Sequence, residues 1–278
     1  MDYLISGSSD FDPVGGSGGS DAARPNKAVP AVALVGTGPG DPELLTVKAL
    51  KRIENADIVL HDELVSDEVL GLIPATAERV AVGKAKGSHS PTQDAINRAL
   101  VAAARAGKRV VRLKGGDPLV FGRAAEELDY LRHHGIACEI VPGVTAALGC
   151  AAAAGFALTD RRAASSVIVV PGHGRDGEPP PDWREVAAKR RTIVVYMGLS
   201  VAGEIAARLI DAGLPPSTPV AVIENGTRPD QRVSTGMLSE LGRLAQRHQN
   251  GPGLLVIGDV VRLAPAWAPA EPAWTAAW

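Results

Sequence analysis

The chain has 278 residues, 45% of them hydrophobic, so it can bury the cores of one large or two medium domains. Its formal net charge of −2 gives no electrostatic reason to expect nucleic acid or an anionic membrane as a partner. Cys138 and Cys150 lie in or near apolar sequence; they are too few for a tetrahedral metal site, and two thiols are favoured over a disulfide. No secretory signal is visible, and the longest apolar stretch, 144–158, is too short to span a bilayer and indicates a buried helix. We therefore expect a cytoplasmic protein without a metal centre.

Both ends of the chain have the composition of tails. Residues 1–29 are dominated by glycine, serine and aspartate, and residues 266–278 by proline and alanine with tryptophans between them. Because such segments bury too little apolar surface to become ordered, we expect a flexible tail at each end.

Strand-like and helix-like patterns alternate between the two tails. Helical patterns such as 41–56 and 90–108 separate many of the strand-like runs, which predicts an α/β fold with mostly parallel strands. About nine strands are many for one open sheet, and a proline-, glycine- and alanine-rich stretch at 142–158 interrupts the rhythm. We therefore expect two α/β domains, at 30–143 and 144–265. The strand-like runs are 31–36, 56–61, 77–83, 108–115, 137–143, 166–172, 191–198, 219–225 and 253–259.

The first glycine-rich turn, GTGPGD at 36–41, follows a strand in the way of a nucleotide-binding βαβ unit. The third glycine of the dinucleotide fingerprint is replaced by Asp41, whose carboxylate would repel a pyrophosphate at the helix N-terminus. Followed by Pro42 and Glu43, Asp41 is typical of a helix cap. Asp62 stands where a ribose-binding acid would lie, so an NAD site stays open as an alternative.

Four further turns with glycine follow strands, at 112–123, 141–147, 195–198 and 224–232. Ligands of open α/β sheets bind at the C-terminal ends of strands, although any one such turn is more often an ordinary turn. Five in one chain, two of them with an aspartate before a proline, favour a ligand that carries no phosphate.

Eight motifs occur in a fixed order along residues 31–262. They are VGTGPGDPELLTVKALKRIENADIVLHDELVS, VGK with GSHSPTQDAIN, VVRLKGGDPLVFGRAAEE, VPGVTAA, LTDRR, PGHG, YMG and ENGTRPDQR. Together they resemble the uroporphyrinogen-III C-methyltransferases of the tetrapyrrole methylase family. The resemblance implies a homodimer of two-domain α/β subunits with the active site in the cleft between the domains. It also implies methylation of uroporphyrinogen III at C2 and C7 by S-adenosylmethionine, which gives precorrin-2 for sirohaem or cobalamin.

The resemblance assigns the cofactor to residues of the glycine-rich turns. S-adenosylmethionine carries a sulfonium, a ribose and an adenine but no phosphate, which agrees with the turn chemistry. Taken alone, Met197 would be read as a core residue, and only the motif match makes it a ligand contact. The implied cofactor-binding residues are Pro39, Gly115, Gly116, Asp117, Val120, Thr145, Ala146, Met197 and Gly226.

The resemblance also assigns catalysis and substrate binding. Asp62 matches the proton acceptor, and Lys84 matches the proton donor, although a role as a carboxylate anchor suits Lys84 equally well. Uroporphyrinogen carries eight carboxylates, for which bidentate arginine is the natural partner. The expected substrate-binding residues are Lys86, Arg112, Arg161, Arg162 and Arg228.

Four positions on the substrate side depart from the family pattern: His61, Ala85, Asp160 and Pro171 stand where tyrosine, arginine, histidine and threonine are usual. They keep two alternatives open, another precorrin methyltransferase and a non-catalytic tetrapyrrole-binding homologue. No dehydrogenase or chelatase segment precedes residue 31, so we expect the chain alone to stop at precorrin-2.

Overall fold

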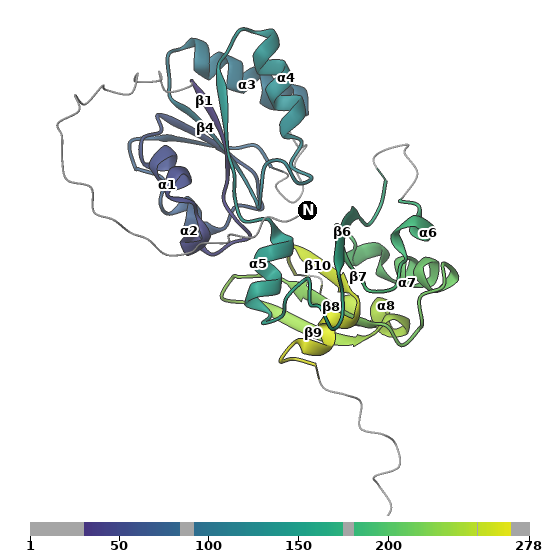
Figure 1. Ribbon diagram of the computed structural model, residues 1–278. Helices are drawn as coiled ribbons and strands as arrows, with labels where there is room; N and C mark the ends of the chain where they lie inside the picture. Colours follow the sequence, from purple (N-terminus) through teal and green to yellow (C-terminus); the bar gives the residue numbers. More distant parts are fainter. Residues whose placement is uncertain (1–30, 84–91, 175–180, 249, 268–278) are drawn as a thin grey trace, which may run out of the picture.

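Two five-stranded sheets build the part of the chain that this computed structural model describes, residues 31–83, 92–174, 181–248 and 250–267 (Figure 1). The first sheet has the order β3-β2-β4-β1-β5 and the second the order β6-β7-β10-β8-β9. The first sheet contains β1 (Val32–Gly36), β2 (Ile58–His61), β3 (Glu78–Ala81), β4 (Val110–Lys114) and β5 (Cys138–Val141). The second contains β6 (Ser166–Pro171), β7 (Arg191–Tyr196), β8 (Pro219–Glu224), β9 (Arg232–Met237) and β10 (Gly253–Ile257).

Each strand-like run of the sequence forms a strand, and the α/β fold class is confirmed. The prediction of mostly parallel strands holds for the first sheet, in which every pairing is parallel. It is wrong for the second sheet, where only β6 and β7 pair in parallel and the other three pairings are antiparallel. Strand β9 was not foreseen. The short connection 225–231 from β8 forces an antiparallel return, because a parallel one needs a long crossover.

The first sheet is covered on both faces, which explains its continuous apolar strands. Val32 and Leu34 of β1 face one core with α3 (Gln93–Arg105) and α4 (Ala124–His133). Ala33 and Val35 face the other core with α1 (Val47–Glu54) and α2 (Asp67–Leu70) (Figure 1). The helix expected from residue 41 is split, since Asp41 caps only a short 3₁₀ helix, η1 (Pro42–Leu44), and Thr46 caps α1.

The second sheet is also sandwiched between helices. Helix α5 (Ala146–Ala153) and the 3₁₀ helix η4 (Asp259–Leu263) cover one face. Helix α5 buries Ala147, Gly149, Cys150 and Ala151, so the buried helix expected within 144–158 is present. The other face packs against α6 (Trp183–Val186), α7 (Ala202–Asp211), α8 (Leu241–Ala245) and the 3₁₀ helices η2 (Leu199–Val201) and η3 (Leu238–Glu240).

The connection from β5 to α5 carries the chain from the first sheet to the second (Figure 1). Our proposed domain boundary between residues 143 and 144 falls in this connection. The expected tail at 1–29 lies outside the described residues. At the other end, two residues of the expected tail are held by the second domain: Thr235 of β9 donates to the carbonyl of Ala266, and Arg262 of η4 stacks on Trp267. Within the described residues, no helix has the length and hydrophobicity to cross a membrane.

Candidate active site

A cavity of about 540 Å³ lies where the strand ends of the two sheets meet. The first sheet contributes the turns after β1, β2, β4 and β5, and the second contributes the ends of β7 and β8. The start of β10 joins them because this strand runs antiparallel to both β7 and β8. The volume is in the range of pockets for small molecules of cofactor size, roughly 300–1,000 Å³.

All nine residues expected to bind the cofactor line this cavity, as do Asp62, Arg112 and Arg228. The structure therefore brings together side chains and turns from positions 39 to 228. Their individual roles stay predictions. Lys84, Lys86 and the departing residue Ala85 lie outside the described residues.

Arg161 and Arg162, expected at the substrate, do not line the cavity. They sit in the turn just before β6, whereas the cavity lies at the opposite end of the neighbouring strand β7. Arg162 instead pairs with Asp160 at 2.8 Å, and its guanidinium holds the pKa of that carboxyl well below the usual range. Asp160, where the family usually has histidine, thus binds Arg162 within this exposed turn and does not contact the cavity.

Backbone atoms of glycines form one wall of the cavity. Gly38 and Gly116 exchange two backbone hydrogen bonds of 3.1 and 2.7 Å, and both have positive φ, at 73° and 69°. Behind them Gly143 packs so tightly that an added Cβ would lie 2.3 Å from the Gly116 carbonyl oxygen. At Gly116 an added Cβ would meet its nearest atom, the Ala146 nitrogen, only at 3.7 Å. This wall therefore lets a ligand approach the main chain, which suits the uncharged edges of an adenosyl group.

Asp117 holds two of the cavity turns together. Its Oδ1 accepts from the Leu119 N–H at 2.8 Å, and its Oδ2 accepts from the Gly143 N–H at 3.0 Å. Each carboxylate oxygen can accept a second hydrogen bond, so Asp117 can also receive a ligand hydroxyl.

Tyr196 is a cavity residue that our sequence reasoning missed, although it precedes Met197 in the YMG motif. Its hydroxyl accepts from the Ala147 N–H at 2.8 Å and lies 2.6 Å from Thr145 Oγ1. It thereby caps α5, whose own N-cap Thr145 makes no capping bond. Burial raises the pKa of the Tyr196 phenol, which keeps the hydroxyl protonated.

Strained backbone gathers around the cavity. Among the described residues, six that are not glycine have positive φ, and three of them, Phe121, Arg123 and Met197, line the cavity. Two more, Asn225 at 51° and Thr227 at 69°, flank the lining residue Gly226. Such conformations cost about 1–3 kcal/mol each and concentrate at ligand sites, so this clustering marks the cavity as functional.

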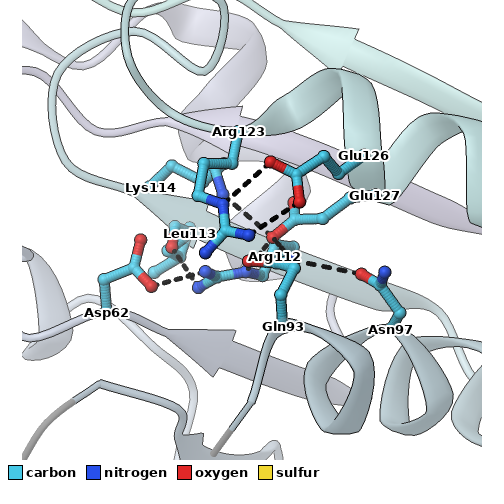
Figure 2. A network of polar contacts seen from close by, with 9 residues as sticks. All are labelled: Asp62, Gln93, Asn97, Arg112, Leu113, Lys114, Arg123, Glu126 and Glu127. Atoms are coloured by element: carbon cyan, nitrogen blue, oxygen red, sulfur yellow. Dashed lines mark hydrogen bonds and ion pairs between the residues drawn. The ribbon is translucent and has the colours of Figure 1, made fainter. Parts of the chain in front are cut away.

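Four charged side chains form a cluster at the floor of the cavity, which we call the charge quartet: Asp62, Arg112, Lys114 and Glu127 (Figure 2). Arg112 Nη2 donates to Asp62, and Arg112 Nε donates to Glu127 at 3.2 Å. Lys114 Nζ donates to the same Glu127 oxygen at 2.9 Å. The pKa of Lys114 is lowered, first by burial and then by the neighbouring Arg112.

Arg112 is thus placed differently from a simple substrate anchor. It lines the cavity, but it is only 2% exposed, and each of its three guanidinium nitrogens donates to a protein oxygen. Lys114 and Glu127 were not predicted. Both lie within the RLKGGDPLVFGRAAEE segment. No residue spacing in that segment reveals that β4 and α4 bring the two side chains into contact.

The connection 225–231 binds the second domain to the first. Thr227 Oγ1 accepts from the Asp41 N–H at 3.1 Å, and Arg228 Nη2 donates to the Leu64 carbonyl at 2.7 Å. Arg228 also packs over Gly40, where an added Cβ would lie 2.5 Å from its Cγ. Arg228, expected at the substrate, therefore also spans the two sides of the cavity.

Six charged residues line the described part of the cavity: the cations Arg112, Lys114, Arg123 and Arg228, and the acids Asp62 and Asp117. Arg112 and Lys114 are paired with acids within the charge quartet, and Arg123 pairs with Glu126, so Arg228 is the lining cation that has no ion pair among the described residues. Apolar side chains make up much of the remaining wall. Such a lining suits a ligand with a flat apolar body and negative groups at its edge.

The fold and this cavity define a two-domain α/β protein with a small-molecule site where its two sheets meet. A family model described as Tetrapyrrole (Corrin/Porphyrin) Methylases matches residues 31–242, and the chain belongs to this family. Siroheme synthase 2 from Cronobacter sakazakii is 52% identical over 232 residues, which are 84% of this chain and 50% of that protein. Siroheme synthase 2 from Yersinia enterocolitica is 51% identical over 84% of this chain and 49% of its own. The chain thus spans about half the length of the curated relatives it matches.

Solved structures resemble the chain over nearly the same region. Uroporphyrin III C-methyl transferase from Thermus thermophilus has a TM-score of 0.73 at 42% identity, covering 84% of this chain and 99% of that one. The same enzyme has been solved in complex with S-adenosyl homocysteine. A cobalt precorrin-4 methyltransferase also reaches a TM-score of 0.73, at 30% identity over 83% of this chain and 95% of that one.

Proposed function

We propose that this chain catalyses the S-adenosylmethionine-dependent methylation of uroporphyrinogen III at C2 and C7, giving precorrin-2 for sirohaem or cobalamin synthesis. One observation carries the proposal: nine residues from separate turns, implied as cofactor contacts by the motifs, line one cavity together with Asp62. The similarity to siroheme synthases and to the Thermus uroporphyrin III C-methyl transferase supports the same activity.

The cavity walls fit S-adenosylmethionine, which supplies an electrophilic methyl group when bound. The glycine wall around Gly116 offers main-chain groups at close range, and Asp117 offers a carboxylate for a hydroxyl. Asp41 speaks against the NAD alternative, since its carboxylate already caps η1 at 2.8 Å from the Glu43 nitrogen. A pyrophosphate at that helix start would meet this negative charge.

Asp62 is in position to assist the substrate. When a pyrrole carbon accepts a methyl group, the ring becomes cationic, and a proton must later leave. The Asp62 side chain lines the cavity, keeps 29% of its surface exposed and is oriented by Arg112. A carboxylate so placed stabilises the positive charge and takes up the proton. We keep Lys84 as the proposed proton donor and Lys86 as a proposed substrate anchor.

The test is incubation of the purified chain with uroporphyrinogen III and S-adenosylmethionine, followed by mass spectrometry. The proposal requires the addition of two methyl groups. Methylation of a later precorrin, with uroporphyrinogen III left unchanged, would favour the alternative of another precorrin methyltransferase. Absence of transfer to either substrate would favour a non-catalytic tetrapyrrole-binding homologue.

We further propose a cytoplasmic homodimer, as the family resemblance implies. Light scattering coupled to size-exclusion chromatography measures the assembly directly. A mass of twice the 28.7 kDa chain would support it, and a monomer at micromolar concentration would contradict it.

A further inference from the structure

Glu127 is the member of the charge quartet that does not line the cavity. It comes from α4 behind the floor, and its side chain is fully buried. One carboxylate oxygen, Oε1, receives three donors: Lys114 Nζ at 2.9 Å, Arg112 Nε at 3.2 Å and Gln93 Nε2 at 3.2 Å. All three donors, whose residues Figure 2 labels, belong to residues that line the cavity.

Burying a carboxylate is costly unless charged partners compensate it. Among the described residues, every hydrogen bond of the Glu127 side chain goes to a cavity residue, and its second oxygen, Oε2, has no hydrogen-bond partner. Among the described residues, the Glu127 carboxylate therefore interacts only with residues that form the cavity floor.

Arg112 transmits this constraint to Asp62. The guanidinium is a rigid planar fork, so fixing two of its nitrogens sets the direction of the third. Glu127 fixes Nε, the Leu113 carbonyl fixes Nη1 at 3.0 Å, and Nη2 then points at Asp62. We propose that Glu127 is a positioning residue for methyl transfer, which holds Arg112 and, through it, the carboxylate of Asp62. This inference rests on the proposed function, in which Asp62 stabilises the cationic ring.

The charge of Glu127 matters as well as its shape. The quartet holds two acids and two cations, so neutralising Glu127 would leave one excess positive charge beside a reaction that develops positive charge on the substrate. The groups that face Lys114 are Arg112, Asp62 and Glu127. Burial and Arg112 lower the pKa of Lys114, whereas Glu127 and Asp62 raise it. Loss of the Glu127 charge therefore lowers the pKa of Lys114 further.

Two substitutions separate shape from charge. Glu127→Gln keeps the Oε1 acceptor and places an amide where Oε2 has no partner, so it removes mainly charge. Glu127→Asp keeps the charge but withdraws the carboxylate by about 1.5 Å, one carbon–carbon bond, which breaks its contact with Arg112. Asp129→Asn is the matched control, because Asp129 lies on the same helix, is exposed and pairs only with Arg132 among the described residues.

The rate of single-turnover methyl transfer to uroporphyrinogen III is measured at saturating substrate concentration. The affinity for adenosylhomocysteine is measured by calorimetry. We expect the rate of both Glu127 variants to fall on the order of 10–100-fold. Losses of this size are typical in metalloenzymes when a residue that orients a metal ligand is removed, and Glu127 would orient Asp62 in a comparable way. Adenosylhomocysteine affinity stays unchanged, and Asp129→Asn keeps the wild-type rate. The rate of Glu127→Gln recovers at alkaline pH as Lys114 loses its proton. In the double variant with Lys114→Gln the excess charge is absent at every pH, so its rate no longer rises with pH.

The outcomes distinguish the two proposals. Wild-type rates in folded Glu127→Gln and Glu127→Asp would overturn the positioning role alone. A rate loss matched by an equal loss of adenosylhomocysteine affinity would also overturn it, because Glu127 would then serve the cofactor wall. If Glu127→Gln does not fold, Glu127→Asp, which keeps a negative charge behind the cavity floor, decides the question. A wild-type chain that transfers no methyl group would overturn the proposed function, and this inference with it.

Discussion

At the scale of single residues, the cavity contains a partly exposed carboxylate, that of Asp62, which buried side chains hold in place. Asp62 keeps 29% of its side-chain surface exposed, whereas the side chain of its partner Arg112 is 3% exposed and further anchored by Glu127. A carboxylate fixed in this way needs little reorganisation when positive charge develops beside it. Tyr196 fixes another wall of the cavity, because its hydroxyl contacts both Thr145 Oγ1 and the Ala147 N–H at the start of α5.

The prediction at this scale concerns Asp62→Asn, which keeps the shape of the side chain and removes its charge. Turnover should fall on the order of 10²–10⁴-fold, the usual contribution of a positioned acid or base. Adenosylhomocysteine affinity should change little, since Asp62 is assigned to the substrate. Steady-state kinetics and calorimetry on one preparation test both points. If the loss of turnover were explained by weaker cofactor binding, Asp62 would be a ribose ligand instead.

At the scale of elements, the connection 225–231 joins the two halves of the site. Thr227 accepts the Asp41 N–H at 3.1 Å while its own backbone sits at a φ of 69°, which is unfavourable for a β-branched residue. Its N–H donates to Gln231 Oε1 at 2.7 Å, which holds the strained turn in place.

Replacing Thr227 with valine tests this link, because valine has the same shape but cannot accept a hydrogen bond. Loss of the acceptor should destabilise the fold by about 1 kcal/mol. It should also weaken adenosylhomocysteine binding, since the turns after β1 and β8 lose the hydrogen bond between them and keep only the packing of Arg228 over Gly40. Thr227→Ser is the matched control, as it keeps the hydroxyl. Urea unfolding and calorimetry measure the two effects; equal behaviour of valine and serine variants would argue against the link.

A buried cluster lies beside the cavity at the end of β8, where Glu224 pairs with the lining residue Gly253, although none of the residues of the cluster lines the cavity. His248 Nε2 lies 2.8 Å from Ser234 Oγ on β9, and its Nδ1 lies 3.5 Å from Glu224 Oε2 on β8. Burial lowers the pKa of His248 below its ordinary value of 6.5, more strongly than Glu224 raises it. The cluster thus fastens the edge strand β9 with a neutral imidazole.

This shift makes stability depend on pH. Because the pKa is lower in the folded state, the unfolded state binds the proton first as the pH falls below about 6.5. The free energy of unfolding should therefore decrease from pH 7 toward pH 5. In His248→Gln this part of the decrease should disappear. Urea unfolding at several pH values measures it, and an identical pH slope in the variant would show that His248 does not titrate on unfolding.

At the scale of the whole molecule, residues of both sheets line the cavity, so a ligand that fills it would link binding to folding. Thr145 and Ala146 follow the first sheet, while Met197 and Gly226 follow strands of the second, and all four line the cavity. A ligand that contacts all four residues binds only the folded chain, in which the two domains face each other across the cavity.

Adenosylhomocysteine should therefore raise the melting temperature of the whole chain in one transition. At a concentration of 100 Kd the gain in unfolding free energy is about 2.7 kcal/mol. NAD at the same concentration should give no shift, because Asp41 occupies the helix start where its pyrophosphate would bind. Differential scanning calorimetry compares the two ligands. Stabilisation by NAD alone would revive the dinucleotide interpretation.

Local sequence determined much of this protein. The nine strand-like runs, the Asp41 cap and the glycine-rich turns that line the cavity follow from the period of apolar residues and from glycine and proline, which act over a few neighbouring residues. The ordered motifs also indicated the family, which the family model over residues 31–242 confirms.

Only the tertiary structure decided which distant groups meet. The antiparallel pairing of β10 brings Gly253 and Leu254 to the cavity, and the turn before β6 puts Arg161 and Arg162 away from it. The charge quartet joins residues from 62 to 127, and the link from Thr227 to Asp41 spans 186 positions. Buried charges and strained turns are stable only when such partners compensate them, and no local pattern along the chain records those partners.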